Sequence, residues 1–433
     1  MSRSHLTADI RNRSMRNVRR FSHTSIRNNS SVPISTVSSR HFYQNEALLD
    51  FASREPRLIS LKQLAFFGRR LNDEKILQSA NFVRQELPAR MAHRIHDMQS
   101  LPYVVVSNPR ISNIYELYYD SFSVLRKFPI IRTIEDNNRY CELLNQRLKL
   151  HTSIVPQLVM GVIECAESIE STRLDRFLDS ILRGRISRRV ITEQHLTMTD
   201  AFLKDKNFNS SDQIGHVFLQ CHAKNVVDQC ASLATRLSLS LHGNIPLPEI
   251  IYEGDVNAKF PYIQSHLRYI IGEILRNTFE ASAERFEATG EIPSPVQVTI
   301  SDSPDYVIFR FSDKAGGLPP EIVPYLWSFV NGPRTAIRHQ NFSKVKGMEA
   351  IVDELEATLD SENFGEGRQK HVSSLSSLTL RSPAIRLGIG LPMSRIYAEF
   401  SGGKLSVKSL EGYGCDVFLH ICKLGNEKHT PSV

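Results

Sequence analysis

The spacing of apolar residues changes abruptly at the segment Gly243 to Pro248. From about Leu58 to Leu241, apolar residues recur mostly at the 3.6-residue period of α-helices, for example in Tyr140 to Leu150 and Leu174 to Leu182. After the change, one long helix is followed by segments with the two-residue alternation of strands. The sequence therefore predicts an α+β protein, with an N-terminal all-α helical bundle (43–242) and a C-terminal α/β domain (243–433).

Turn signals support this division. The bundle is punctuated by three prolines expected between antiparallel helices: Pro102, Pro109 and Pro129. Ser303 to Asp305 separates two alternating runs, at 296–300 and 307–311, which predicts a β-hairpin. A second hairpin is expected from Lys404 to His420. The stretch between the hairpins, about 331–386, has little strand pattern and is predicted to be a mobile insert that acts as a lid.

Charge is concentrated at the beginning of the chain. Residues 1–42 hold eight Arg, no Lys and one acidic residue, Asp9, whereas the remainder has 45 basic and 45 acidic residues. This composition predicts a mitochondrial transit peptide, disordered and processed near Arg19 to Ser22, with a disordered basic tail as the alternative. The balanced remainder gives no reason to expect nucleic-acid binding. No apolar run is long enough to predict a membrane span.

The predicted helix from Ser265 to Phe286 carries the first candidate site residues. Its polar side includes Glu273 and Asn277, which lie one helical turn apart, and Arg276. Such a face is usually a solvated surface. The six cysteines form no metal-ligand spacing and no CxxC motif, so zinc and dithiol sites are not supported.

Three glycine-containing motifs follow this helix in a fixed order: Ser312 to Gly317, Gly388 to Pro392 and Gly412 to Asp416. Together with the helix, they resemble the four ATP-binding boxes of the GHKL superfamily, whose Bergerat fold is an α/β sandwich. Each glycine pair alone is weak, because glycines also mark ordinary turns. The occurrence of all four motifs in this order over about 150 residues is specific for the superfamily. A P-loop, an HRDxxxxN catalytic loop and a complete GxGxxG are not found.

The chemistry of these residues suits a bound nucleotide. Asn277 offers a neutral oxygen ligand for Mg²⁺, and Asp313 offers an acceptor for the exocyclic amine of adenine. The segment Gly388 to Leu391 precedes a helix expected from about Pro392 to Phe400, whose first N–H groups can receive phosphate. The full set predicted to bind the nucleotide is Asn277, Arg276, Asp313, Gly317, Leu318, Gly388, Ile389, Gly390, Leu391 and Cys415.

The segment Gln85 to Ile95, QELPARMAHRI, closely resembles a segment of the mitochondrial pyruvate and branched-chain 2-oxo acid dehydrogenase kinases. Further matches are Ser100 to Pro102, Phe177 to Asp179 and Lys259 to Ile263, so the resemblance extends from about residue 43 to 423. His93 within this segment is expected to have a structural role, because the residue after it is not acidic as in bacterial histidine kinases.

The resemblance implies that the bundle binds the lipoyl domain of the E2 core, and that the C-terminal domain phosphorylates a serine of the E1 α subunit in the mitochondrial matrix. It implies ATP and Mg²⁺ as cofactors, with K⁺ as a further candidate, and a homodimer. Glu273 falls on the general base of the family; the alternative is that it orders a metal-bound water.

Four departures bear on the substrate and the assembly. Tyr269 replaces a His of the pyruvate kinases, Arg276 replaces a Lys, Cys415 replaces a Thr, and the C-terminal tail lacks their Asp-Trp element. The leading hypothesis is a serine kinase that inactivates pyruvate dehydrogenase. The alternatives are a kinase of the branched-chain complex and a non-catalytic, ATP-gated scaffold bound to E2. Transfer of labelled phosphate to either E1 distinguishes the three.

Overall fold

The computed structural model describes residues 46–68, 71–204, 213–332 and 387–424. The predicted transit peptide and all but the first two residues of the predicted insert lie outside these ranges. The first part of the described chain is helical, as expected. Its helices are α1 (Glu46–Ala52), α2 (Leu61–Phe67), α3 (Asp73–Gln99), α4 (Tyr103–Val106), α5 (Pro109–Leu125), α6 (Ile134–Leu150), α7 (Ile154–Glu164) and α8 (Ser171–Lys204).

Side-chain caps explain where several of these helices begin. Thr133 accepts a hydrogen bond from the backbone N–H of Asp136, whose carboxylate accepts in return from the N–H of Thr133, so a capping box starts α6. Asn108 caps α5, and Pro109 fills the first helical position, where its missing N–H costs nothing. Pro102 precedes α4 and Pro129 lies between α5 and α6, as expected, whereas Pro109 belongs to α5 itself.

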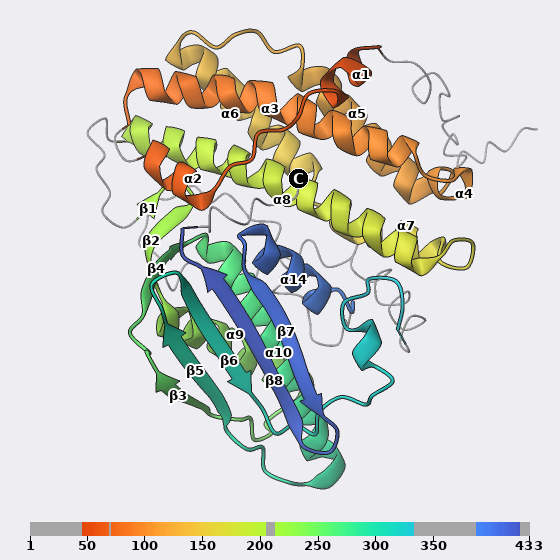
Figure 1. Ribbon diagram of the computed structural model, residues 1–433, viewed down its shortest axis with the longest axis vertical. Coiled ribbons are helices and arrows are strands. Elements are labelled where there is room, and N and C mark those ends of the chain that lie inside the picture. Colours follow the sequence, from red (N-terminus) through yellow and green to blue (C-terminus); the bar gives the residue numbers. More distant parts are fainter. Residues whose placement is uncertain (1–45, 69–70, 205–212, 333–386, 425–433) are drawn as a thin grey trace, which may run out of the picture. The chain divides into compact units, whose positions relative to one another are not determined.

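The second part contains a five-stranded mixed sheet (Figure 1). Its strands, in spatial order, are β3 (Ile250–Gly254), β5 (Val296–Asp302), β6 (Tyr306–Ser312), β8 (Gly414–Cys422) and β7 (Lys404–Leu410). Both predicted hairpins are present, as the antiparallel pairs β5 with β6 and β7 with β8. Strand β3 pairs with β5 in parallel, which the sequence did not indicate.

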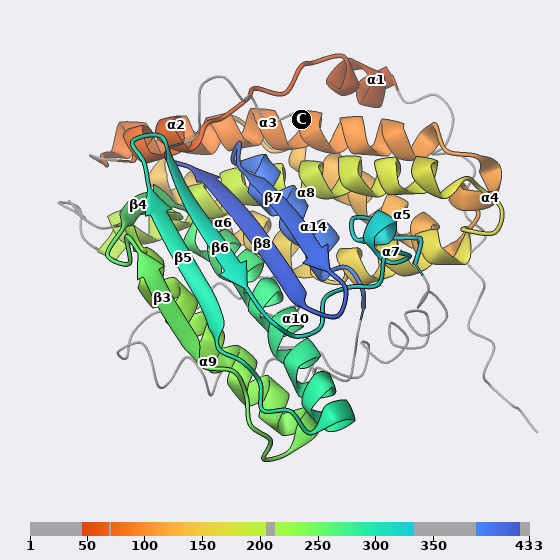
Figure 2. The same cartoon turned by 60° about the horizontal axis from the view of Figure 1, so that its bottom comes forward.

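Three helices lie on one face of this sheet (Figures 1 and 2): α9 (Ala223–His242), α10 (Gln264–Thr289) and α14 (Gly390–Phe400). The strand residues that alternate in sequence also alternate in burial; Val298 and Phe309, for example, are fully buried. Helices α10 and α14 pack against each other, and α14 also packs against α8 of the helical part. The short 3-10 helix η2 (Val323–Tyr325) follows the β6 segment.

A second sheet was not predicted. Strands β1 (Gln213–Ile214), β2 (Val217–His222) and β4 (Lys259–Tyr262) form a small antiparallel sheet in the order β1-β2-β4. The pairing of Cys221 with Phe260 joins residues on both sides of the boundary expected at Gly243 to Pro248. Helix α9, before that boundary, packs closely against α10. The prediction that residues 43–242 are all-α is therefore wrong for β1 and β2, because these strands pair with each other and with β4, across the expected boundary.

None of the six cysteines forms a disulfide. Within the described ranges, no helix combines the length and the apolarity needed to cross a membrane.

Candidate functional site

Helix α10 carries a buried group of charged residues where a solvated face would have been the ordinary expectation. Glu273 is 1% exposed and Arg276 is 5% exposed. The Arg276 Nε donates a hydrogen bond of 2.9 Å to Oε1 of Glu280, one turn further along the helix. Asn277 differs from these neighbours because its side chain is exposed. The polar side of α10 is thus buried under other elements, except at Asn277.

The carboxylate of Glu273 lies against the beginning of α14. Gly390 is the first residue of that helix, and a Cβ atom added there would overlap Oε2 of Glu273 and lie 3.0 Å from its Cδ. Only glycine permits this approach of a backbone to a carboxylate. Glu273 and the motif Gly388 to Leu391, far apart in sequence, are therefore neighbours in the structure.

Asp313 follows β6 and is 7% exposed. Its Oδ1 accepts hydrogen bonds from the backbone N–H groups of Ala315 (3.0 Å) and Cys415 (3.2 Å). Thr278 of α10 donates a longer bond, 3.5 Å, to Oδ2. Burial raises the pKa of Asp313 above its ordinary value, against the lowering effect of these bonds. The carboxylate is therefore fixed in place by these hydrogen bonds.

The segment after Asp313 is held by the turn of the β7–β8 hairpin. Gly317 has a φ of +70°, and a Cβ there would lie 2.8 Å from the carbonyl carbon of Leu410, so glycine is required on both counts. The N–H of Leu318 donates to Oγ of Ser409 at 2.7 Å, and Cys415 Sγ donates to the same oxygen at 3.3 Å. These contacts join two of the predicted motifs.

The third motif forms the N-terminal end of α14. Gly388 is exposed with a φ of +67°, Ile389 is the N-cap residue, and α14 begins at Gly390. Within the described residues, the N-cap residue Ile389 gives this end of the helix no side-chain hydrogen bond. Its first N–H groups and the positive end of the helix dipole therefore have no side-chain acceptor from the cap position.

The predicted site residues are thus brought together around α10. The Thr278 to Asp313 contact joins α10 to the β6 segment, and the Glu273 to Gly390 contact joins it to α14. Thr278 and Ser409 were not among the predicted residues. Thr278 directly follows Asn277, and that adjacency is the one signal that could have identified it.

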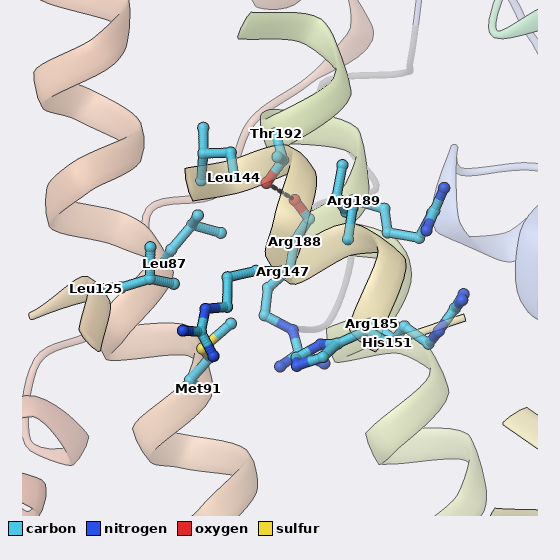
Figure 3. Close-up of a pocket in the computed structure, with 11 residues that line it drawn as sticks. Leu87, Met91, Leu125, Leu144, Arg147, His151, Arg185, Arg188, Arg189 and Thr192 are labelled. Atoms are coloured by element: carbon cyan, nitrogen blue, oxygen red, sulfur yellow. Dashed lines mark hydrogen bonds between the residues drawn. The ribbon is translucent and has the colours of Figure 1, made fainter. Parts of the chain in front are cut away.

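A separate cavity of about 30 Å³ lies within the helical part (Figure 3). Its walls come from α3, α5, α6 and α8, and Arg147, Arg185, Arg188 and Arg189 line it together with His151. Burial, with Arg188 and Arg185 nearby, lowers the pKa of His151 to about 3. Burial likewise lowers the pKa of Arg185 to about 10. Periodicity alone could not have shown that these side chains converge.

His93, for which the sequence predicts a structural role, lies on α3 and is hydrogen-bonded. Its Nε2 lies 2.8 Å from the carbonyl oxygen of Arg54. This contact suits the structural role that was expected.

The sequence is similar to those of several known proteins. Residues 58–218 match the family described as mitochondrial branched-chain alpha-ketoacid dehydrogenase kinase. The chain is 34% identical to the mitochondrial pyruvate dehydrogenase (acetyl-transferring) kinase 2 of Saccharomyces cerevisiae, over 91% of this chain and 87% of that protein. It is 27% identical to the corresponding mitochondrial kinase of Arabidopsis thaliana, over 86% and 91%. It is 25% identical to human isozyme 4, over 87% and 84%. The chain therefore belongs to the mitochondrial 2-oxo acid dehydrogenase kinase family and is an ATP-dependent protein kinase.

Proposed function

We propose that this kinase phosphorylates a serine of the E1 α subunit of the mitochondrial pyruvate dehydrogenase complex and thereby inactivates it, using MgATP bound in a GHKL-type site. The main support is the position of Glu273: a buried carboxylate that lies against the start of α14, one turn from the exposed Asn277. A general base and a metal ligand are needed in this proximity for phosphoryl transfer.

The chain's residues fit the groups that such a site must hold. Asn277 is exposed between the buried residues Arg276 and Thr278, so its amide oxygen is available to Mg²⁺. Asp313, fixed by two backbone N–H groups, would accept the adenine amine. The uncapped start of α14 would receive phosphate charge. Bound Mg²⁺ would neutralise charge that develops on the phosphates.

Glu273 acts on the substrate serine in this proposal. The serine Oγ bonds to the γ-phosphorus while the bond from that phosphorus to the bridging oxygen of ADP breaks, and Glu273 accepts the hydroxyl proton. Arg276, oriented by Glu280, would face the phosphates as a cation.

The proposed partner, oligomeric state, compartment and second ion follow from membership of the family. The helical part would bind the lipoyl domain of the E2 core, the kinase would be a homodimer, and it would act in the mitochondrial matrix. K⁺ would be a second ion at the nucleotide. A kinase of the branched-chain complex is the second candidate, because residues 58–218 match the family described by that name and Tyr269 departs from the pyruvate kinases.

The test is transfer of labelled phosphate from ATP to purified pyruvate and branched-chain E1, each with its own E2 core. Labelling of pyruvate E1 on the α subunit is expected. Preferential labelling of the branched-chain E1 would select the second candidate. ATP binding without labelling of either protein would leave the scaffold hypothesis and refute the proposal.

A further inference from the structure

One side of α8 carries polar residues at intervals of four: Ser171, Asp175, Asp179 and Arg183. Residues at this spacing lie on one face of a helix, with a slow drift around its axis. In this structure, that face contacts two segments of the C-terminal part. One is the stretch Trp327 to Asn331, and the other is α14.

Asp175 holds the first of these segments. Its Oδ2 accepts a hydrogen bond of 2.6 Å from Oγ of Ser328, and its Oδ1 accepts from the backbone N–H of Phe329 at 2.8 Å. The N–H of Val330 adds a longer bond of 3.3 Å to Oδ1. Phe329 and Val330 are buried, so this anchor fixes the backbone as well as side chains.

Arg183 holds the second segment. Its Nε donates to Asp179 at 2.7 Å, while its Nη2 donates to Oε2 of Glu399 in the last turns of α14. The other oxygen of Glu399 accepts from Nε of Arg395 at 2.7 Å. The Arg395 guanidinium lies 5.3 Å from the ring centre of Trp327.

These contacts close on themselves. Asp175 contacts Ser328, whose neighbour in sequence, Trp327, contacts Arg395. Arg395 and Arg183 both contact Glu399, and Arg183 lies on α8 with Asp175. We call these residues, together with Asp179, the α8 network. Arg183 and Glu399 are 15% and 27% exposed, and each makes two charged contacts. Because one side chain serves two bonds, ordering it costs less entropy for each bond than in an isolated surface pair.

The network contacts the C-terminal end of α14, which is remote from the proposed nucleotide site. Eleven residues at about 1.5 Å each make α14 a rod of roughly 16 Å. Glu399 is near its C-terminal end, and Gly390, against Glu273, is its first residue. A displacement at Glu399 therefore moves Gly390 and the N–H groups proposed to receive phosphate.

We propose that Arg183 is a positioning residue for nucleotide binding: by holding Glu399 it fixes the orientation of α14, and with it the N-terminal end that lies beside Glu273. This inference rests on the proposed function, since it takes the start of α14 as the phosphate site. Arg183 lies on the bundle helix α8 and acts through α14.

The experiment compares Arg183→Leu and Arg183→Lys with the unaltered protein, in the full-length chain. The matched control is Lys423→Met, which breaks an ion pair with Asp302 whose side chains are similarly exposed, 19% and 31%. Neither Lys423 nor Asp302 belongs to the α8 network or to the predicted site. KM for ATP, Kd for MgADP and KM for E1 are measured for each variant.

Arg183→Leu should raise KM for ATP and Kd for MgADP about tenfold, equivalent to about 1.4 kcal/mol, with KM for E1 unchanged. Arg183→Lys keeps the charge but loses the planar fork, so an intermediate rise of about threefold is expected. Trp327, the single tryptophan of the chain, should become more accessible to iodide quenching in both variants. Lys423→Met should change none of these values.

Nucleotide affinity within twofold of the unaltered protein in Arg183→Leu would overturn the inference, as would an equal loss in Lys423→Met. If Arg183→Leu does not fold, Arg183→Lys decides by the same criterion. Failure of the unaltered protein to bind MgADP is a different result, because it refutes the nucleotide site itself.

Discussion

The carboxylate of Glu273 on α10 and the backbone of Gly390 at the start of α14 are in direct contact, although 117 positions separate them in sequence. Gly390→Ala places a methyl group onto Oε2 of Glu273. Because Glu273 is buried, the carboxylate or α14 must shift. A shift of about 1 Å near reacting groups can cost on the order of 100-fold in rate, and a loss of kcat of this order is expected.

Gly290→Ala is the control for this variant, because nothing lies within 4 Å of a Cβ there. Its φ of +74° predicts a cost in unfolding free energy of about 1 to 2 kcal/mol with unchanged kcat. Full activity of Gly390→Ala would show that the close contact is not needed for transfer.

Glu273→Gln separates binding from transfer. The amide has nearly the same shape as the carboxylate but cannot accept the serine proton, so Kd for MgADP should stay within about twofold. The rate of phosphate transfer should fall by roughly 10²- to 10⁴-fold, the usual contribution of a general base. Single-turnover transfer and nucleotide titration measure the two effects. Undiminished transfer would remove Glu273 as the base.

Asn277→Ala should abolish Mg²⁺-dependent ATP binding. Since Asn277 is exposed, its removal should change the unfolding free energy by no more than about 0.5 kcal/mol. Asn113→Ala on α5, also exposed, is the matched substitution and should leave ATP binding intact. Titration of ATP affinity against Mg²⁺ is the measurement, and an unchanged Mg²⁺ dependence in Asn277→Ala would refute its role as a ligand.

Asp313 predicts a pH dependence of ATP affinity. Burial raises its pKa, so the carboxylate protonates at a higher pH than an exposed aspartate. If Asp313 accepts the adenine amine as proposed, ATP loses an ionised acceptor as pH falls through that value. The same shift makes ionised Asp313 unfavourable to the fold, a cost that appears as pH rises through the raised pKa. Asp313→Asn should therefore weaken ATP binding without lowering stability near neutral pH.

Calorimetric titration with ATP, repeated across pH 5 to 8, tests this relation. A fall in affinity towards low pH is expected in the unaltered protein and should be smaller in Asp313→Asn. An identical pH profile in the variant would show that another group is responsible.

Three buried histidines predict acid sensitivity of the fold. Burial lowers the pKa to about 3 for His151 and His266 and to about 4 for His195, below the ordinary value near 6.5. The unfolded chain therefore binds more protons, and stability present above about pH 6.5 is lost as pH falls towards 4. Each histidine contributes roughly 1.4 kcal/mol per pH unit in this range.

Urea unfolding at pH 7, 6 and 5 measures the effect. His195→Gln retains polar atoms near Ser79, which lies 3.0 Å from His195 Nδ1, but does not titrate. The slope of unfolding free energy against pH should be smaller in this variant by the contribution of one histidine. Equal slopes in the variant and the unaltered protein would show that His195 does not contribute to the pH dependence of the unfolding free energy.

Local signals predicted much of the C-terminal fold. The helix expected at Ser265 to Phe286 is observed at Gln264–Thr289, and both expected hairpins occur, the first with its turn at Ser303 to Asp305. The spacing of apolar residues, the turn residues and the aspartate at the end of a strand are signals carried by a few neighbouring residues, so they can be recognised in the sequence. The same applies to α14, expected from about Pro392 and observed from Gly390.

Features that depend on distant contacts could not be predicted in this way. The polar side of α10 resembled a solvated surface, yet Glu273 and Arg276 are buried because other elements cover them. The parallel pairing of the short strand β3 with β5 has no local signal. The cavity beside His151 requires four helices to converge, and the contact of Arg183 with Glu399 spans 216 positions.

Strand β8 is the last strand of the described chain, yet it lies between β6 and β7 inside the sheet. Ribosomal synthesis therefore delivers the interior of the sheet last, after both of its neighbours. Until Gly414–Cys422 has been made, β6 remains an exposed edge and Asp313 lacks the N–H of Cys415. Loss of strand β8 would thus leave β6 as an aggregation-prone edge and remove one of the two backbone N–H groups that bond to Asp313.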